Sequence, residues 1–378
     1  MKDNIQTICM QFERKYQCQM IIGPGILADI KTHLIPLLPT AEVVLVTNPL
    51  LEQLYGKRLV ADLLNHKVAV KVILVPDGEN YKNISTAKKI FDKLLQGQVN
   101  RSTTLITLGG GVIGDLGGFV AATFMRGIPL IHIPTTLLAQ IDSSIGGKVA
   151  VDHWRAKNII GSFYQPIAIL VDPAVLESLP VEHLKNGLVE AIKIAIIQSP
   201  SFFQWLKQNI DLLLEKNRRA LNILVNRAIK LKSEIVLQDP WERKERYYLN
   251  LGHSIGHALE VMGGYENITH GEAVAAGIIM ETQIAHYKNI CPTKEMNEIE
   301  DIIKRLQLNP RLNWEEFDLE KLWNTILLDK KNKKGGIRFV LPEAIGKVDL
   351  YQPIWKEDVA HVFNAILTEK KKGGIKIC

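Results

Sequence analysis

LITLGGGVIGDLGGFVAA, residues 105–122, runs from apolar β-branched residues through a group of glycines into a helical pattern. The order predicts a strand, a tight turn and a helix. Gly109, Gly111 and Gly114 satisfy G-x-G-x-x-G, a spacing that lets backbone amides at a helix N-terminus approach a pyrophosphate. A plain tight turn would explain the same glycines. The acidic residue expected about 20 positions later in the common dinucleotide fold is absent, because residues 128–138 read IPLIHIPTTLL.

Two further strand ends carry polar groups. PDGENYK, residues 76–82, follows an apolar run and places Glu79 and Lys82 at the start of a helical pattern. PTT, residues 134–136, ends another run with two hydroxyls. Small and polar residues at three strand ends are typical of a nucleotide-binding crevice in a parallel sheet.

The wider pattern divides the chain in two. Short β-rich runs occur at residues 42–48, 71–76, 103–111, 129–136 and 168–172. Helical patterns separate these runs, which predicts parallel strands with crossover helices. After about residue 175 helical periodicity dominates. We therefore predict an α/β nucleotide-binding domain at residues 1–175 and an all-helical C-terminal domain at residues 176–378, joined near residues 172–180.

The composition is that of an ordinary globular protein. The chain has 378 residues, of which 47% are hydrophobic and 23% charged, and a formal net charge of +6. This charge favours small anions over nucleic acid, because no basic stripe with interleaved aromatics is visible. No apolar run predicts a membrane span, and the N-terminal residues lack a signal-peptide core. The four scattered cysteines predict free thiols and a cytoplasmic location.

Histidines stand out in the second half. LNLGHSIGHALE, residues 249–260, places His253 and His257 in an apolar run. If residues 246–257 form one helix, Arg246, Asn250 and both histidines lie within about 60° of one another at 3.6 residues per turn. Leu251, Ile255 and Leu259 would occupy the other side. Satisfied core histidines are one explanation of this polar stripe, and a divalent metal with an anionic ligand is the one we favour.

Other groups could complete such a site. His270 follows in THGEAVAAGI, and Glu190 and Lys193 lie three apart in the apolar NGLVEAIKIAII. Glu190 and Lys193 could form a structural ion pair, or Glu190 could bind a metal while Lys193 holds a charged group. Two histidines and one carboxylate with an open position are typical of catalytic Zn²⁺. Ser254 follows His253 where a zincin metalloprotease has its general base, so that chemistry is not expected.

A glycine-rich segment carries more charge. LLAQIDSSIGGKVAVDHWRAKNIIGSF, residues 137–163, places Asp142, Lys148, Lys157 and Asn158 among apolar residues and glycines. A solvated loop is one interpretation. The functional one is a cradle for the phosphate and carboxylate of a small substrate.

The chain resembles the dehydroquinate synthase family of sugar-phosphate cyclases. The resemblance extends from VVLVTN to DKKNKKGGIRFVLPEAIGKV and is most specific in GGGVIGDLGGFVAATFMRG and PTTLLAQIDSSIGGK. It implies an NAD⁺-binding α/β domain, a helical domain that binds Zn²⁺ or Co²⁺, and a homodimer.

The resemblance also implies roles for individual residues. The metal ligands would be Glu190, His253 and His270. The substrate site would comprise Asp142, Lys148, Asn158, Lys193, Lys232, Arg246, Asn250, His257 and Lys331, with Arg126 reaching the substrate phosphate of the neighbouring subunit. Catalysis would fall to Lys148, Lys193, Lys232, Arg246, Asn250 and His257. The nucleotide contacts would be Asn48, Glu79, Lys82, Gly110, Gly111, Asp115, Thr135, Thr136, Asp142, Ser143, Lys157, Val175, Ser178 and Leu179.

The implied reaction converts a sugar-acid phosphate, 3-deoxy-arabino-heptulosonate 7-phosphate, into 3-dehydroquinate and phosphate. It proceeds by transient oxidation of an alcohol, elimination of phosphate, reduction and intramolecular aldol closure. Val149, Ala150, Asp152, Trp154, Ala156 and Glu245 depart from the usual family residues. Lys232, Arg246 and Asn250 remain, which favours a substrate with a carboxylate over sedoheptulose 7-phosphate or glucose 6-phosphate. An amino-sugar analogue, a metal-dependent polyol dehydrogenase and a non-catalytic binding protein are the alternatives.

Overall fold

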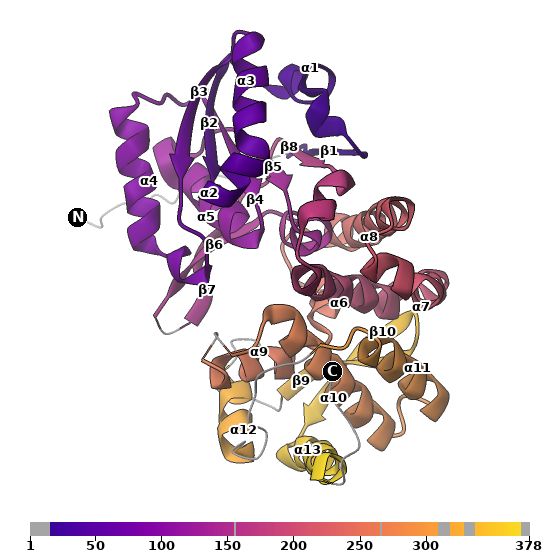
Figure 1. Ribbon diagram of the computed structural model, residues 1–378. Helices are drawn as coiled ribbons and strands as arrows, with labels where there is room; N and C mark the ends of the chain where they lie inside the picture. The colour runs from indigo at the N-terminus through magenta and orange to yellow at the C-terminus, as the bar shows by residue number, and fades with distance from the viewer. Residues whose placement is uncertain (1–15, 155, 265–266, 309–317, 329–336, 372–378) are drawn as a thin grey trace, which may run out of the picture.

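The computed structural model describes residues 16–154, 156–264, 267–308, 318–328 and 337–371. The first part of the chain forms a sheet covered by helices, and the second part is mainly helical (Figure 1). The two parts pack against each other through α6 (Val181–Gln198) and α8 (Arg218–Gln238), which contact the segment that follows β5 (Leu130–Pro134).

Six parallel strands form the sheet. Their order across it is β1, β8, β5, β4, β2, β3. The five strands besides β5 are β1 (Gln19–Ile22), β2 (Glu42–Thr47), β3 (Ala69–Leu74), β4 (Thr104–Gly109) and β8 (Ala168–Val171). The five strands predicted from the sequence are confirmed, and β1 is an addition at the sheet edge.

The strands read as continuous apolar runs because helices cover both faces of the sheet. In β2, Val44 and Val46 pack on one side, against α4 (Ile84–Gln96) and α5 (Gly111–Thr123). Val43 and Leu45 point to the opposite side, which is covered by α1 (Ile30–His33) and α3 (Lys57–Asn65). A short helical stretch, α2 (Pro49–Leu51), precedes α3.

The glycine-rich segment at residues 137–163 is not an open loop. It begins with a π-helical turn at Ala139–Ser143 and continues as an antiparallel hairpin of β6 (Lys148–His153) and β7 (Ala156–Phe163). In Figure 1 this hairpin extends from the sheet towards α9 (His253–Met262). It therefore brings residues of the first part of the chain to the second.

The second part buries a large apolar core. Its remaining helices are α7 (Pro200–Leu214), α10 (His270–Tyr287), α11 (Thr293–Lys304), α12 (Leu319–Leu328) and α13 (Lys356–Lys371). The prediction of a helical second part is confirmed, but the part is not all-helical, because β9 (Ile337–Ala344) and β10 (Lys347–Ile354) form an antiparallel hairpin within it. The predicted boundary after residue 175 falls inside the 3₁₀ helix Pro173–Ser178 and stays a prediction.

In the described ranges, no helix combines the length and the apolar character needed to cross a membrane.

Candidate active site

The glycine turn lies where β4 leads into α5. Gly110 is the N-cap of α5, whose first turn carries no acidic residue, so its free backbone amides can face an anion. A Cβ at Gly109 would lie 2.5 Å from that of Ile113, and one at Gly110 would lie 3.1 Å from Cγ2 of Thr136. The turn therefore needs glycine at Gly109 and Gly110 for close packing.

Charged groups surround this turn. The buried Lys82 ammonium lies 2.6 Å from Oδ2 of Asp115 on α5, and it also donates to Oδ1 of Asn158 on β7. Asp115 raises the pKa of Lys82, although burial alone would lower it. Lys157, beside Asn158, lies 3.8 Å from Oε1 of Glu79. The structure thus brings together five of the predicted nucleotide and substrate residues.

The other predicted nucleotide residues also lie near carboxyl ends of strands. Thr135 and Thr136 follow β5, and Asp142 and Ser143 belong to the π-helical turn after it. Asn48 follows β2, where its amide donates to Asp77. A further group lies in or directly after the 3₁₀ helix that follows β8: Val175, Ser178 and Leu179. Val175 and Leu179 are buried, and Tyr55 contacts Ser178.

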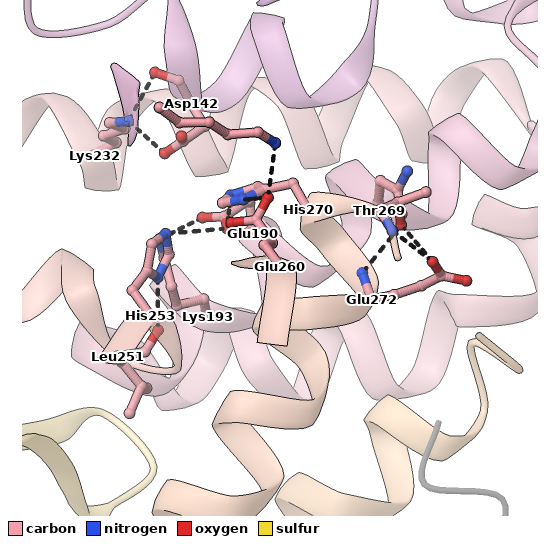
Figure 2. A network of polar contacts seen from close by, with 12 residues as sticks. Asp142, Glu190, Lys193, Lys232, Leu251, His253, Glu260, Thr269, His270 and Glu272 are labelled. Carbon is pink, nitrogen blue, oxygen red and sulfur yellow. Dashed lines mark hydrogen bonds and ion pairs between the residues drawn. The ribbon is translucent and has the colours of Figure 1, made fainter. Parts of the chain in front are cut away.

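Glu190, His253 and His270 come together in the helical part. Figure 2 shows them converging from α6, α9 and α10, and one ligand atom of each lies within 4.8 Å of the others. Oε1 of Glu190 is 3.6 Å from Nε2 of His270 and 4.0 Å from Nε2 of His253. Two ligands of a tetrahedral Zn²⁺ lie about 3.4 Å apart. A small adjustment would therefore let the three groups share an ion.

The surroundings of this cluster fit a metal. Both carboxylate oxygens of Glu190 are buried and lack a hydrogen bond among the described residues, although Lys193 forms an ion pair with Oε2. Nδ1 of His253 donates to the carbonyl of Leu251 at 3.1 Å, which leaves the Nε2 lone pair directed at the cluster. The buried Oε1 of Glu190, which has no hydrogen bond in the described ranges, and the fixed imidazole tautomer of His253 both fit a divalent ion.

The histidines do not lie on one long helix, as predicted for residues 246–257. A 3₁₀ helix covers Glu245–Asn250, and α9 begins at His253. The break is at Gly252, whose φ of 78° lies in the left-handed region. This correction has a physical cause. The backbone amides of Gly252 and Ile255 donate to the buried carboxylate of Glu281 on α10, which fixes the start of α9.

The histidine rings nevertheless lie close together. The His253 and His257 rings lie 5.2 Å apart between centroids, and the His253 and His270 rings 5.4 Å apart. His257 is outside the three-residue metal cluster. Leu251, Ile255 and Leu259 are fully buried on the other side, as predicted.

Cationic groups lie next to the metal cluster. Lys232 on α8 forms an ion pair with Asp142, and its ammonium also donates to the Asp142 carbonyl at 2.7 Å (Figure 2). Lys232 and Lys193 hold the pKa of Asp142 far below its usual value against the opposing effect of burial. Arg246 is buried, and its Nη1 donates to the carbonyls of Gly146 and Pro240. These fixed charges would suit a dianionic ligand.

Three other predicted residues are placed differently, and a fourth lies outside the described residues. Lys148 on β6 is half-exposed and pairs with Glu242 at 2.6 Å. The amide of Asn250 donates to the Tyr247 carbonyl. Arg126 lies at the amino end of β5, away from the carboxyl ends that carry the glycine turn. Lys331 lies outside the described residues.

Two carboxylates at the site were not predicted. Glu242 contacts Lys148, and the buried Glu260 contacts both Lys157 and His270. Glu260 follows His257 by three residues, so its place on the same face of α9 was visible in HALE. Its contact with Lys157 joins distant parts of the chain and has no local sequence signal.

A glycine turn for a nucleotide phosphate beside a buried carboxylate and two imidazoles defines a class of nucleotide- and metal-dependent enzymes. Within it, models of the 3-dehydroquinate synthase N-terminal and C-terminal regions match residues 72–186 and 187–332. A 3-dehydroquinate synthase of Thermodesulfovibrio yellowstonii is 40% identical over 93% of this chain and 97% of its own. The chain belongs to the 3-dehydroquinate synthase family.

Two solved structures have a similar fold. A 2-epi-5-epi-valiolone synthase from Streptomyces hygroscopicus, with NAD⁺ and Zn²⁺ bound, gives a TM-score of 0.87 at 26% identity and covers 97% of this chain and 100% of its own. A 2-deoxy-scyllo-inosose synthase complexed with carbaglucose-6-phosphate, NAD⁺ and Co²⁺ gives 0.83 at 25% identity, with coverage of 92% and 96%.

Proposed function

We propose that this chain is a 3-dehydroquinate synthase, which converts 3-deoxy-arabino-heptulosonate 7-phosphate to 3-dehydroquinate and phosphate. Family membership supports this activity. The observation that carries the choice of substrate is the set of buried cations, Lys193, Lys232 and Arg246, next to the candidate metal cluster. A substrate with both a phosphate and a carboxylate needs several such partners in a site that excludes water.

The two cofactors would occupy adjoining sites. The turn at Gly110 and Gly111, with Lys82, Asp115 and the polar strand ends, would hold NAD⁺, and Glu190, His253 and His270 would hold Zn²⁺ or Co²⁺. When bound, NAD⁺ supplies a reversible hydride acceptor and the metal a Lewis acid at the substrate alcohol.

The chain's own residues would bind and orient the sugar. Lys193 and Lys232 lie in helices packed against the π-helical turn, so their ammonium groups are held in place. Two backbone carbonyls fix the Arg246 guanidinium, which leaves its other N–H groups for the substrate carboxylate. His257, beside the cluster but outside it, would donate a hydrogen bond to a substrate hydroxyl. Lys148, Asn158, Asn250 and Lys331 would complete the pocket.

We also propose a homodimer in which Arg126 contributes to the substrate site of the neighbouring copy. Arg126 precedes β5, and the glycine turn lies beyond the other end of the sheet. A five-residue strand spans roughly 16 Å, which is more than an arginine side chain covers. Arg126 would therefore contact the substrate phosphate of a second subunit. The cytoplasmic location stays a prediction.

The test compares three sugar phosphates with purified protein, NAD⁺ and Zn²⁺. We expect phosphate release from the heptulosonate phosphate, loss of release on chelation, and recovery with Zn²⁺ or Co²⁺. Faster release from sedoheptulose 7-phosphate or glucose 6-phosphate would assign a different cyclase activity. Absence of release from all three would refute the proposal.

A further inference from the structure

Glu260 lies between the two candidate cofactor sites. Its side chain is buried near the C-terminal end of α9, and Oε1 is 3.7 Å from Nδ1 of His270 and 3.3 Å from Nζ of Lys157. One carboxylate oxygen thus faces a candidate metal ligand and a lysine of the β6–β7 hairpin. Figure 2 shows Glu260 beside His270, close to the three-residue cluster.

The contact with His270 has a direct effect on a metal ligand. Nε2 of His270 faces Glu190, so Nδ1 is the nitrogen that remains for Glu260. A carboxylate on the second nitrogen fixes the tautomer and the ring orientation and makes the metal-binding nitrogen more basic. His270 is the first residue of α10, so the helix restrains it only from the C-terminal side. Glu260 supplies that restraint from α9.

The contact with Lys157 joins the two parts of the chain. Lys157 belongs to β7 and also lies 3.8 Å from Glu79, which follows β3. Both Lys157 and Glu79 are proposed nucleotide contacts. Successive ionic contacts therefore connect Glu79 to Lys157, Lys157 to Glu260, and Glu260 to His270. Glu260 is buried, so the loss of Lys157 would leave its carboxylate with one ionic partner fewer in a site with little water.

We propose that Glu260 is a positioning residue that couples occupancy of the nucleotide site to the affinity of the metal site. The coupling rests on the proposed function, since it requires both cofactors. Nucleotide bound at Lys157 and Glu79 restricts the hairpin and so holds the Glu260 carboxylate against His270. The metal then binds a site that is already ordered, which raises its affinity. Thermodynamic linkage requires that the metal raise the affinity for NAD⁺ by the same factor.

The test measures Co²⁺ binding to the metal-free full chain from the visible absorption of the bound ion, with and without saturating NAD⁺. In the wild type we expect NAD⁺ to tighten Co²⁺ binding about fivefold or more. Glu260→Gln should bind Co²⁺ about 10- to 100-fold more weakly, with an NAD⁺ effect near one. Glu260→Asp keeps the charge but shortens the side chain, so it should also lose the coupling.

Glu300→Gln is the matched control. Glu300 is buried on α11, accepts from Gln283 and pairs with Lys304 at 2.7 Å, so this variant also removes the charge of a buried glutamate that pairs with a lysine. It should behave as the wild type. A Glu260→Gln or Glu260→Asp variant with the wild-type NAD⁺ effect would overturn the proposed coupling but not the proposed function. A wild type whose Co²⁺ affinity is the same with and without NAD⁺ would do the same. A wild type that binds neither cofactor would overturn the proposed function and the coupling with it.

Discussion

His253 and His257 lie about one turn apart on α9 but have different surroundings. His253 faces Glu190 and has its Nδ1 fixed by a backbone carbonyl, whereas His257 lies outside the ligand cluster. We expect His253→Ala to lose bound metal and His257→Ala to retain it while turnover falls about 10²- to 10⁴-fold. Metal analysis of the dialysed variants, with steady-state rates, checks both outcomes. Equal metal loss in the two variants would contradict the division of roles.

His270 makes metal binding depend on pH. Burial alone would lower the pKa of His270, but its contacts with Glu190 and Glu260 raise it to about 10 in the metal-free protein. An ion must displace that proton. Below pH 10 we therefore expect metal binding to release about one proton from His270, and the apparent affinity to rise about tenfold per pH unit towards that value. Calorimetry in buffers of different ionisation enthalpy counts the protons. Binding without proton release would contradict the prediction.

The residues of the candidate metal cluster were easier to single out in the sequence than the residues that contact them. Glu190, His253 and His270 are unusual in apolar helices, so their sequence context marks them. Glu260 and Glu242 are ordinary helix and loop residues in the sequence. Their significance comes from Lys157 and Lys148, which the β6–β7 hairpin brings to them. Such long-range ion pairs depend on tertiary packing and have no local pattern.

At the scale of elements, the packing of α9 against α10 places two candidate metal ligands, His253 and His270, next to each other. Gly252 has a left-handed backbone, and a Cβ there would lie 2.5 Å from Cγ1 of Ile278 and 2.8 Å from the Val274 carbonyl. We expect Gly252→Ala to lower the free energy of unfolding by roughly 2–4 kcal/mol, from backbone strain and overpacking. Urea denaturation of the wild type and the variant measures this difference in the free energy of unfolding.

Gly264→Ala is the control for that substitution. Gly264 also has a positive φ, of 66°, but a Cβ there would meet nothing within 4 Å. Only the backbone term remains, so this variant should lose about 1–2 kcal/mol. Equal losses in the two variants would show that close packing between α9 and α10 does not contribute.

Elements were predictable where one periodicity covered their whole length. β2, β4 and β5 are buried on both faces and read as unbroken apolar runs. The hairpin of β6 and β7 was missed, because its charged residues and flanking glycines resemble a loop. The predicted helix across residues 246–257 failed at Gly252, where a contact with Glu281 outweighs helical periodicity.

At the scale of the whole molecule, the site needs both parts of the chain and, by our proposal, a second copy. If Arg126 acts in the neighbouring subunit, Arg126→Ala and His253→Ala homodimers should each be inactive. A heterodimer would keep one site with its own metal and the partner copy's arginine. We expect re-associated equal mixtures to regain about a quarter of wild-type activity. Failure of exchanged mixtures to regain activity would show that Arg126 acts in its own chain.

The general architecture was easier to predict from the sequence than the contacts between the two parts of the chain. Alternating strands and helices, followed by helices alone, indicated two packed regions, and the structure confirms a parallel sheet and a mainly helical second part. The connection between Lys157 and Glu260 was not predictable, because it depends on how the hairpin meets α9.

The central claim is that the chain uses NAD⁺ as a catalyst that is regenerated in each cycle. The most direct measurement follows phosphate and NADH together during turnover of the heptulosonate phosphate, with less NAD⁺ than substrate. We predict many phosphates released per NAD⁺, with no accumulation of NADH. Accumulation of NADH in proportion to turnover, as in a dehydrogenase, would contradict the account.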